Sequence, residues 1–161
     1  ARGTYSGYGA NSCTDCEEGK YAEAEASSTC SACDSGYYQD HTKAFECIEC
    51  SAGKYASSTG SDQCVECAEG TYSNYNNMTT SLVSCLNCVA GKYASTTGQD
   101  ECDECGRGRY SNQQADVCEP CEAGKYADGL GSAGSCKSCD EGTMQDETGQ
   151  QSCEKCAEGK F

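Results

Sequence analysis

Large apolar side chains are scarce in this 161-residue chain. Tryptophan is absent, phenylalanine occurs twice, proline occurs once, and the mean hydropathy is −0.73. No apolar run approaches the ~18 residues of a membrane-spanning helix, so the sequence predicts no membrane span in this segment. The chain has the length of a globular domain but not the apolar side chains for its core, so covalent cross-links have to take over that role.

Cationic and catalytic side chains are also few. The 11 Lys and Arg stand against 26 Asp and Glu, which gives a formal net charge of −15 and excludes nucleic acid as a partner. His41 is the only histidine, and no Ser or Cys nucleophile motif surrounds it, so we predict no enzyme, no catalytic residue and no cofactor. The densest acidic cluster, residues 100–104, lacks the ligand pattern and glycine of an EF-hand loop and is interpreted as a solvated turn.

Cysteine, by contrast, is abundant and regularly spaced. Eighteen cysteines form nine Cys-x-x-Cys pairs, and the step between pairs is 17 residues in five of the eight intervals. A fixed period of this length indicates a tandem repeat in which each unit contacts only its neighbours. Cysteine at this density is typical of disulfide scaffolds in oxidising compartments, so we expect an extracellular or cell-surface location.

A second signature follows each pair. Glycine stands three residues after the second cysteine, at positions 19, 36, 53, 70, 91, 108, 124, 142 and 159, and Gly3 fits the same register. Two residues after these glycines come Tyr5, Tyr21, Tyr38, Tyr55, Tyr72, Tyr93, Tyr110, Tyr126, Met144 and Phe161. The glycine most simply supplies a positive-φ turn, and we expect each ring to pack on the nearest disulfide rather than on a ligand.

These patterns predict the fold class. Turn-rich segments such as 57–60 and 95–98 favour short strands joined by turns, with two-stranded ribbons at most and no helical periodicity. We therefore expect small disulfide-rich repeats that form an elongated rod of short β-ribbons and turns, with little or no helix and no single hydrophobic core.

The Cys-x-x-Cys pairs have two other chemical interpretations. A four-thiolate zinc site is compatible with the spacing, but nine pairs leave one pair over, and four such sites would raise the negative charge further. Gly106 is the only glycine directly after a second cysteine, where zinc knuckles favour one. A thiol–disulfide oxidoreductase would need a thioredoxin-like helix N-terminus, which nothing in the sequence supplies. We predict no metal site.

One repeat carries an insertion. The interval from Cys64 to Cys85 has four extra residues near 74–80, and these contain the sequon Asn77-Met78-Thr79. Insertions in repeats usually lie in exposed loops, so we predict an N-glycan on Asn77. Residues 1–161 are expected to form one continuous array of about nine to ten repeats, cut from a longer array with a cysteine immediately before Ala1.

The phrase Cys-x2-Gly-x-Tyr…Cys-x2-Cys resembles the ephrin-receptor-like cysteine-rich repeat, which is related to growth-factor-receptor and TNF-receptor-like modules. The resemblance covers the whole chain, and Cys16 to Cys30 looks like the single-disulfide submodule that opens TNF-receptor repeats. It implies an elongated, extracellular, non-enzymatic protein, such as a receptor ectodomain, an adhesion protein or a long surface or flagellar-hair protein.

Two connectivities stay open for the disulfides. We favour a ladder in which the second cysteine of each pair bonds the first cysteine of the next pair; the alternative links pairs two by two, as in 13–30 with 16–33. In the ladder, Cys13 and Cys156 bond to cysteines outside the segment. The ladder joins Cys16 to Cys30, Cys33 to Cys47, Cys50 to Cys64, Cys67 to Cys85, Cys88 to Cys102, Cys105 to Cys118, Cys121 to Cys136 and Cys139 to Cys153.

Two functional hypotheses follow. The first is a structural stalk or filament subunit of a secreted or cell-surface glycoprotein, which self-assembles or joins other fibre subunits and bears an N-glycan and possible O-glycans. The second is a ligand-binding receptor or adhesion ectodomain. A binding site usually needs a repeat that breaks the pattern with exposed aromatic or Arg side chains. Apart from the insertion, we expect no such repeat, which favours the structural hypothesis.

Overall fold

The computed structural model describes residues 1–74 and 83–157. Short β-strands and turns make up these residues, which contain no helix, and this confirms the predicted fold of disulfide-rich repeats. Within the same two ranges, no helix has the length and apolarity that crossing a membrane requires.

The chain divides into two compact units. Unit 1 comprises Ala1–Cys67 and Ser73–Cys85, and unit 2 comprises Ala68–Tyr72 and Leu86–Phe161. Unit 1 contains β1 (Thr4–Tyr5), β2 (Thr14–Asp15), β3 (Lys20–Tyr21), β4 (Ser31–Ala32), β5 (Tyr37–Tyr38), β6 (Ile48–Glu49), β7 (Lys54–Tyr55) and β8 (Val65–Glu66). Unit 2 contains β9 (Thr71–Tyr72), β10 (Leu86–Asn87), β11 (Lys92–Tyr93), β12 (Asp103–Glu104), β13 (Arg109–Ser111), β14 (Glu119–Pro120), β15 (Lys125–Tyr126), β16 (Ser132–Ala133), β17 (Lys137–Ser138), β18 (Thr143–Met144) and β19 (Glu154–Lys155).

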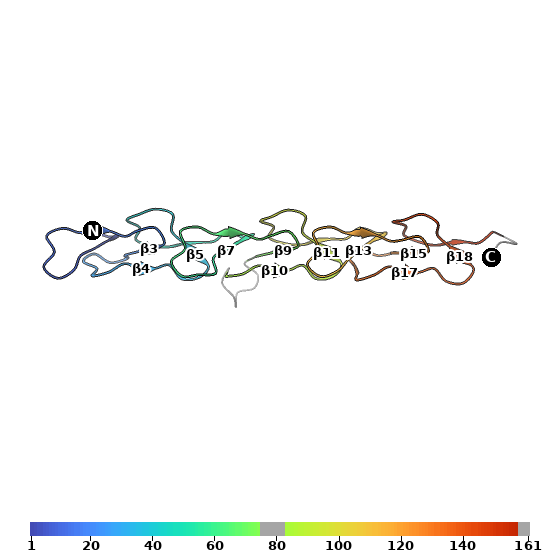
Figure 1. The fold of residues 1–161 in the computed structure, drawn as a ribbon, viewed down its shortest axis with the longest axis horizontal. Coiled ribbons are helices and arrows are strands. Elements are labelled where there is room, and N and C mark those ends of the chain that lie inside the picture. Colours follow the sequence, from blue (N-terminus) through green and yellow to red (C-terminus); the bar gives the residue numbers. More distant parts are fainter. Residues whose placement is uncertain (75–82, 158–161) are drawn as a thin grey trace. The chain divides into compact units, whose positions relative to one another are not determined.

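Each antiparallel ribbon follows one rule of register. The two residues after a repeat glycine pair with the two residues inside the next Cys-x-x-Cys. In unit 1, β3 pairs with β4, so that Tyr21 lies opposite Ser31. In unit 2, β15 pairs with β17, so that Tyr126 lies opposite Lys137 (Figure 1). The spacer of the cysteine pair is therefore itself a strand, which explains why its length is constant.

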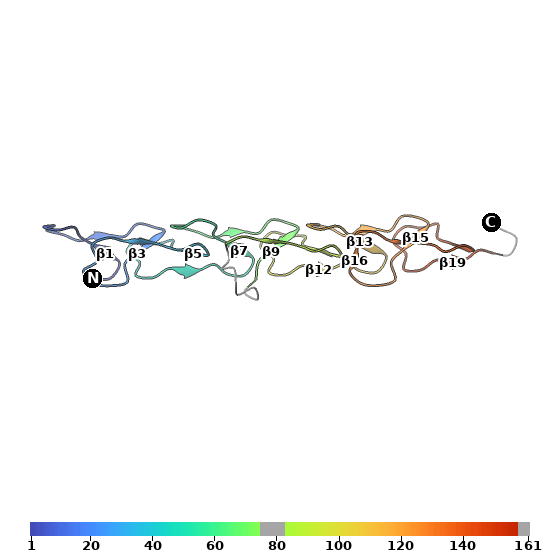
Figure 2. The ribbon, with the colours of Figure 1, turned by 90° about the horizontal axis from the view of Figure 1, so that it is seen from below.

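The sequence led us to expect ribbons of two strands at most, and this expectation was wrong for one ribbon. In unit 2, β13 has an antiparallel partner, β14, and a parallel partner, β16, which comes from the following repeat (Figure 2). Parallel bridges of the same kind join Tyr5 to Ser27 and Tyr93 to Ala115. The strand that follows the glycine of one repeat thus pairs with the turn segment of the next repeat. Without this pairing, the backbone groups on the free edge of that strand would have no hydrogen-bond partner.

Backbone hydrogen bonds join neighbouring loops, and close backbone approaches at the repeat glycines extend one loop further, so the expectation that each unit contacts only its neighbours was wrong. The eight disulfides close loops that we number in chain order: loop 1 (Cys16–Cys30), loop 2 (Cys33–Cys47), loop 3 (Cys50–Cys64), loop 4 (Cys67–Cys85), loop 5 (Cys88–Cys102), loop 6 (Cys105–Cys118), loop 7 (Cys121–Cys136) and loop 8 (Cys139–Cys153). The Cys33 amide donates a hydrogen bond to the Gly19 carbonyl in loop 1 at 2.9 Å. The Cys33 carbonyl accepts one from the Gly60 amide in loop 3 at 2.7 Å.

The repeat glycines allow backbone segments from loops two apart to approach each other closely. A Cβ built on Gly19 would lie 2.2 Å from the Gly60 carbonyl oxygen, two loops further along the chain, and one built on Gly108 would lie 1.9 Å from the Gly149 oxygen. Both glycines have φ of +75°, so the position needs glycine for its conformation and also for the close approach of another backbone segment.

In each unit, the core consists mainly of small residues and sulfur. The second cysteines of the first seven pairs are completely buried. Three residues after seven of the repeat glycines lies a second buried position, occupied by Ala22, Gln39, Ala56, Ser73, Ala94, Ser111 and Ala127. The carbonyls at these positions accept the amide of the preceding loop's glycine, as Ala22 does from Gly3 at 2.9 Å. Six of these seven residues are Ala or Ser, and the seventh, Gln39, is satisfied because its side-chain amide donates to the Glu46 carbonyl at 2.8 Å.

Candidate functional site

The disulfides are the first candidate feature. The structure contains eight, and their pairs are those of the ladder: the second cysteine of each pair is joined to the first cysteine of the next. The Cα–Cα distances are 5.6 to 5.8 Å, within the usual range for a disulfide. Each bond closes a loop of about 15 residues, for which chain entropy predicts about 3 kcal/mol of stabilisation.

The remaining predicted positions are dispersed. Cys13 is exposed and Cys156 is half-buried, and neither is bonded within the chain. Asn77 lies outside the described residues. His41 is exposed and its Nδ1 contacts the Asp40 carboxylate. In the described part of the chain, no three His, Cys, Asp or Glu side chains gather as metal ligands.

The tyrosine row consists of the tyrosines two residues after the repeat glycines, which we expected to pack on disulfides. Tyr38 does so. Tyr38, in loop 2, packs with Cys64 against the buried pair Cys50 and Ala56 in loop 3. The ring therefore packs against the disulfide of the following loop. All eight tyrosines of the row are half-buried, so each keeps part of its ring accessible to solvent.

One accessible ring holds a cation. Lys137 Nζ lies 5.9 Å from the centroid of the Tyr126 ring and 2.8 Å from Asp128 Oδ1. The hydrogen bond between the two charged groups lowers the pKa of Asp128 and raises the pKa of Lys137. Tyr126, Asp128 and Lys137 thus form an ammonium clamp, a term that we use below for a tyrosine and a carboxylate that share one cation.

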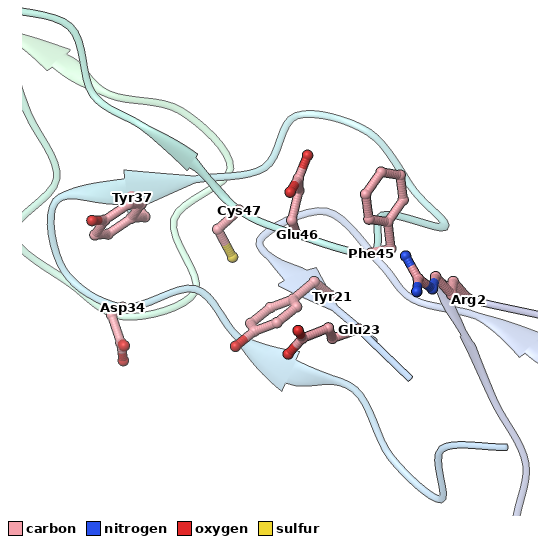
Figure 3. A pocket seen from close by; sticks show the side chains of 8 residues that line it. All are labelled: Arg2, Tyr21, Glu23, Asp34, Tyr37, Phe45, Glu46 and Cys47. Atoms are coloured by element: carbon pink, nitrogen blue, oxygen red, sulfur yellow. The ribbon is translucent and has the colours of Figure 1, made fainter. Parts of the chain in front are cut away.

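A groove with a volume of about 370 Å³ lies in unit 1 and is lined by Arg2 and by residues of loops 1 and 2. Its rings are Tyr21, Tyr37 and Phe45. Figure 3 shows Tyr21 beside Glu23, the Arg2 guanidinium beside Phe45, and Tyr37 with Asp34 on the other side of Cys47. The charged side chains that line the groove are Arg2, Glu23, Asp34 and Glu46.

Smaller grooves at the same repeat positions are lined by Lys20 and by Lys125, and the groove of loops 1 and 2 differs from them because loop 2 departs from the repeat. The residue directly after the repeat glycine is Tyr37 in loop 2, whereas it is Lys, Arg or Thr in all the remaining loops. Elsewhere this lysine neutralises an acid: Lys54 pairs with Glu66 at 3.3 Å, and Lys125 pairs with Glu122 at 2.9 Å. In loop 2, Asp34 stands at the repeat position of Glu122, and Glu49 stands at that of Glu66. Neither acid forms an ion pair among the described residues.

Comparison with known proteins finds a family match over the first part of the chain. Residues 3–45 and 19–63 match the family model described as tyrosine-protein kinase ephrin type A/B receptor-like. Residues 3–63 thus match ephrin-receptor-like cysteine-rich repeats. Both matched segments begin at a repeat glycine, Gly3 or Gly19, so they are one repeat out of step with each other. Among curated proteins, none matches the chain.

The ephrin-receptor-like repeats are an extracellular and non-catalytic type of module. In this chain, the pattern of the repeats hid the groove from sequence reasoning, which expected no repeat outside the insertion to break the pattern with exposed aromatic side chains. That expectation was wrong, because Tyr37 and Phe45 do so within loop 2 and both are exposed. The signal was present in the alignment of the repeats, as one aromatic residue in a column of Lys, Arg and Thr.

Proposed function

We propose that this chain is a non-catalytic structural segment, a stalk or filament subunit, of a large secreted or cell-surface glycoprotein. In this proposal it assembles, with itself or with other subunits, into an extracellular fibre or coat such as a flagellar hair. Asn77 carries an N-glycan there, and Ser- and Thr-rich turns are available for O-glycans.

The observation that supports this function is the way the loops are fastened. Each loop is closed by a disulfide and bonded through its backbone to the loop before it and the loop after it, as Cys33 illustrates. A chain held by covalent bonds and backbone hydrogen bonds does not depend on a large apolar core and resists unfolding and proteolysis. These are the properties that a load-bearing extracellular segment needs.

Electron microscopy of the native, unfractionated material tests the proposal. We expect fibres or a coat that an antibody against this segment decorates, and we expect their integrity to depend on salt, because a net charge of −15 has to be offset where copies meet. Dispersed monomers over the full range of salt would contradict assembly.

The groove supports a second candidate, a ligand-binding or adhesion ectodomain. Aromatic and charged side chains are enriched where proteins bind partners, and loop 2 concentrates both on one surface. Native monomers that bind a soluble partner tightly and saturably would favour this function over the structural one.

A further inference from the structure

Unit 2 shows how these repeats hold an ammonium group. The clamp uses three repeat positions: the tyrosine two residues after the glycine, the acid two residues after that tyrosine, and the first residue inside the next Cys-x-x-Cys. In loop 7 these are Tyr126, Asp128 and Lys137, and Lys137 is the cross-strand partner of Tyr126.

Loop 1 has the same clamp without its cation. Tyr21 and Glu23 occupy the positions of Tyr126 and Asp128, and Ser31 occupies the position of Lys137 as the cross-strand partner of Tyr21. Both Tyr21 and Glu23 line the groove of unit 1, where they lie side by side (Figure 3). The chain therefore presents a tyrosine and a carboxylate in the arrangement that holds an ammonium elsewhere, with a short neutral side chain where the lysine would stand.

The rest of the groove suits the same ligand. Three carboxylates line it, those of Glu23, Asp34 and Glu46, against the single guanidinium of Arg2. None of these four groups forms an ion pair within the described residues, which contain seven such pairs. Tyr37 and Phe45 add two exposed rings over which an alkylammonium chain can lie.

We propose that this groove binds the ammonium group of a lysine side chain on a basic segment of a partner protein. The ammonium would lie between the Tyr21 ring and the Glu23 carboxylate, and its methylene stem would pack against Tyr37 and Phe45. A partner rich in lysine is favoured over a second copy of the chain, because 26 acids against 11 bases make two copies repel each other. This inference goes beyond the structural function and does not depend on fibre formation.

The binding experiment uses the soluble, oxidised chain and the probe Nα-acetyl-lysine methylamide, followed by the NMR signals of the tyrosine rings. We expect saturable shifts at Tyr21 and Tyr37, but not at Tyr126, whose clamp is already filled. The neutral analogue Nα-acetyl-norleucine methylamide should cause at most a tenth of the response at equal concentration, since it lacks the charge.

Four variants give the experiment its controls. Ser31→Lys fills the clamp from within and should weaken probe binding at least tenfold, whereas Ser152→Lys adds the same charge at an exposed site in unit 2 and should change it less than twofold. Glu23→Gln should weaken binding about fivefold without altering the fold. Lys137→Ser should create a new probe-dependent shift at Tyr126, because it empties the clamp of loop 7.

Three outcomes would overturn the proposal. Equal binding by the norleucine analogue would make the groove an apolar site. Equal weakening by Ser31→Lys and Ser152→Lys would reduce the effect to long-range charge. Saturable shifts at Tyr21 and Tyr37 with a neutral methyl glycoside, and none with the lysine probe, would assign the groove to carbohydrate. Each outcome is independent of whether the native protein forms fibres.

Discussion

Replacing Gly108 by alanine should separate the two reasons for a glycine at this repeat position. Gly108 and Gly124 occupy equivalent positions in loops 6 and 7, with φ of +75° and +77°. A Cβ on Gly108 would lie 1.9 Å from the Gly149 oxygen and 2.5 Å from its carbon, whereas a Cβ on Gly124 would meet nothing within 4 Å. Gly124→Ala is therefore a matched control that carries only the cost of the backbone conformation.

The magnitudes differ enough to be measured. Alanine in the left-handed region costs about 1–2 kcal/mol, and both variants bear this cost. Gly108→Ala must in addition displace a backbone segment, and forced overpacking of this kind costs about 1–3 kcal/mol more. The contact between loops 6 and 8 should therefore open roughly 5 to 150 times more often in Gly108→Ala than in Gly124→Ala, at a factor of ten per ~1.4 kcal/mol.

Native-state hydrogen exchange reports this opening at one amide. The Gly149 N–H in loop 8 donates to the Cys121 carbonyl in loop 7 at 2.8 Å, and we expect this amide to exchange when the Gly149 segment moves away from Gly108. We expect its exchange to accelerate in Gly108→Ala well beyond its rate in Gly124→Ala, with all disulfides intact. Equal acceleration in the two variants would refute the reasoning, because only the positive φ would then matter.

Further predictions concern the buried core positions, the cross-links and the glycan. Ser111→Ala should destabilise loops 5 and 6 by about 1 kcal/mol in urea unfolding, because the Ser111 hydroxyl bonds both the Lys92 carbonyl at 2.9 Å and the Gly91 amide at 3.0 Å; an unchanged midpoint would show that water replaces it. Ala94→Leu should cost about 1–3 kcal/mol in the same assay, since Ala94 is fully buried between backbone segments. Peptide mapping of a non-reduced digest should recover the ladder pairs, and a peptide linking Cys13 to Cys30 would contradict them. Mass spectrometry of natively secreted protein should find a glycan on Asn77, and an unmodified Asn77 would count against the sequon.

Much of the fold could be predicted because the constraints are local. The spacing of the cysteines and the glycine that follows each pair determine where a turn and a ribbon can form, and Tyr21 opposite Ser31 is the result. The contact between Gly19 and Gly60 could not be predicted, because a positive φ already explained the glycine and hid its second role. The buried position of Ala22 was missed for a similar reason, since an alanine in a short polar repeat gives no apolar signal.

The aromatic residues of the groove were missed because the sequence analysis compared the residues that the repeats have in common. The repeats were compared for what they share, and the shared features are those that close the loops. Tyr37 and Phe45 are visible only as departures from their columns, and their meaning depends on loops 1 and 2 lying side by side. Sequence repetition thus predicts the scaffold well, whereas the structure shows that these two rings line one groove with residues of loop 1.

The reach of each glycine to the second loop ahead also sets a minimum length for an excised piece. Two loops alone contain no such contact, whereas three consecutive loops contain the first complete one, as loops 1 to 3 do through Gly19 and Gly60. The free energy of unfolding should therefore not rise by equal increments as loops are added. It should increase most between a piece of two loops and a piece of three loops. Any truncation leaves two loops at its forward end without their partners, so fraying there should extend over two loops rather than one.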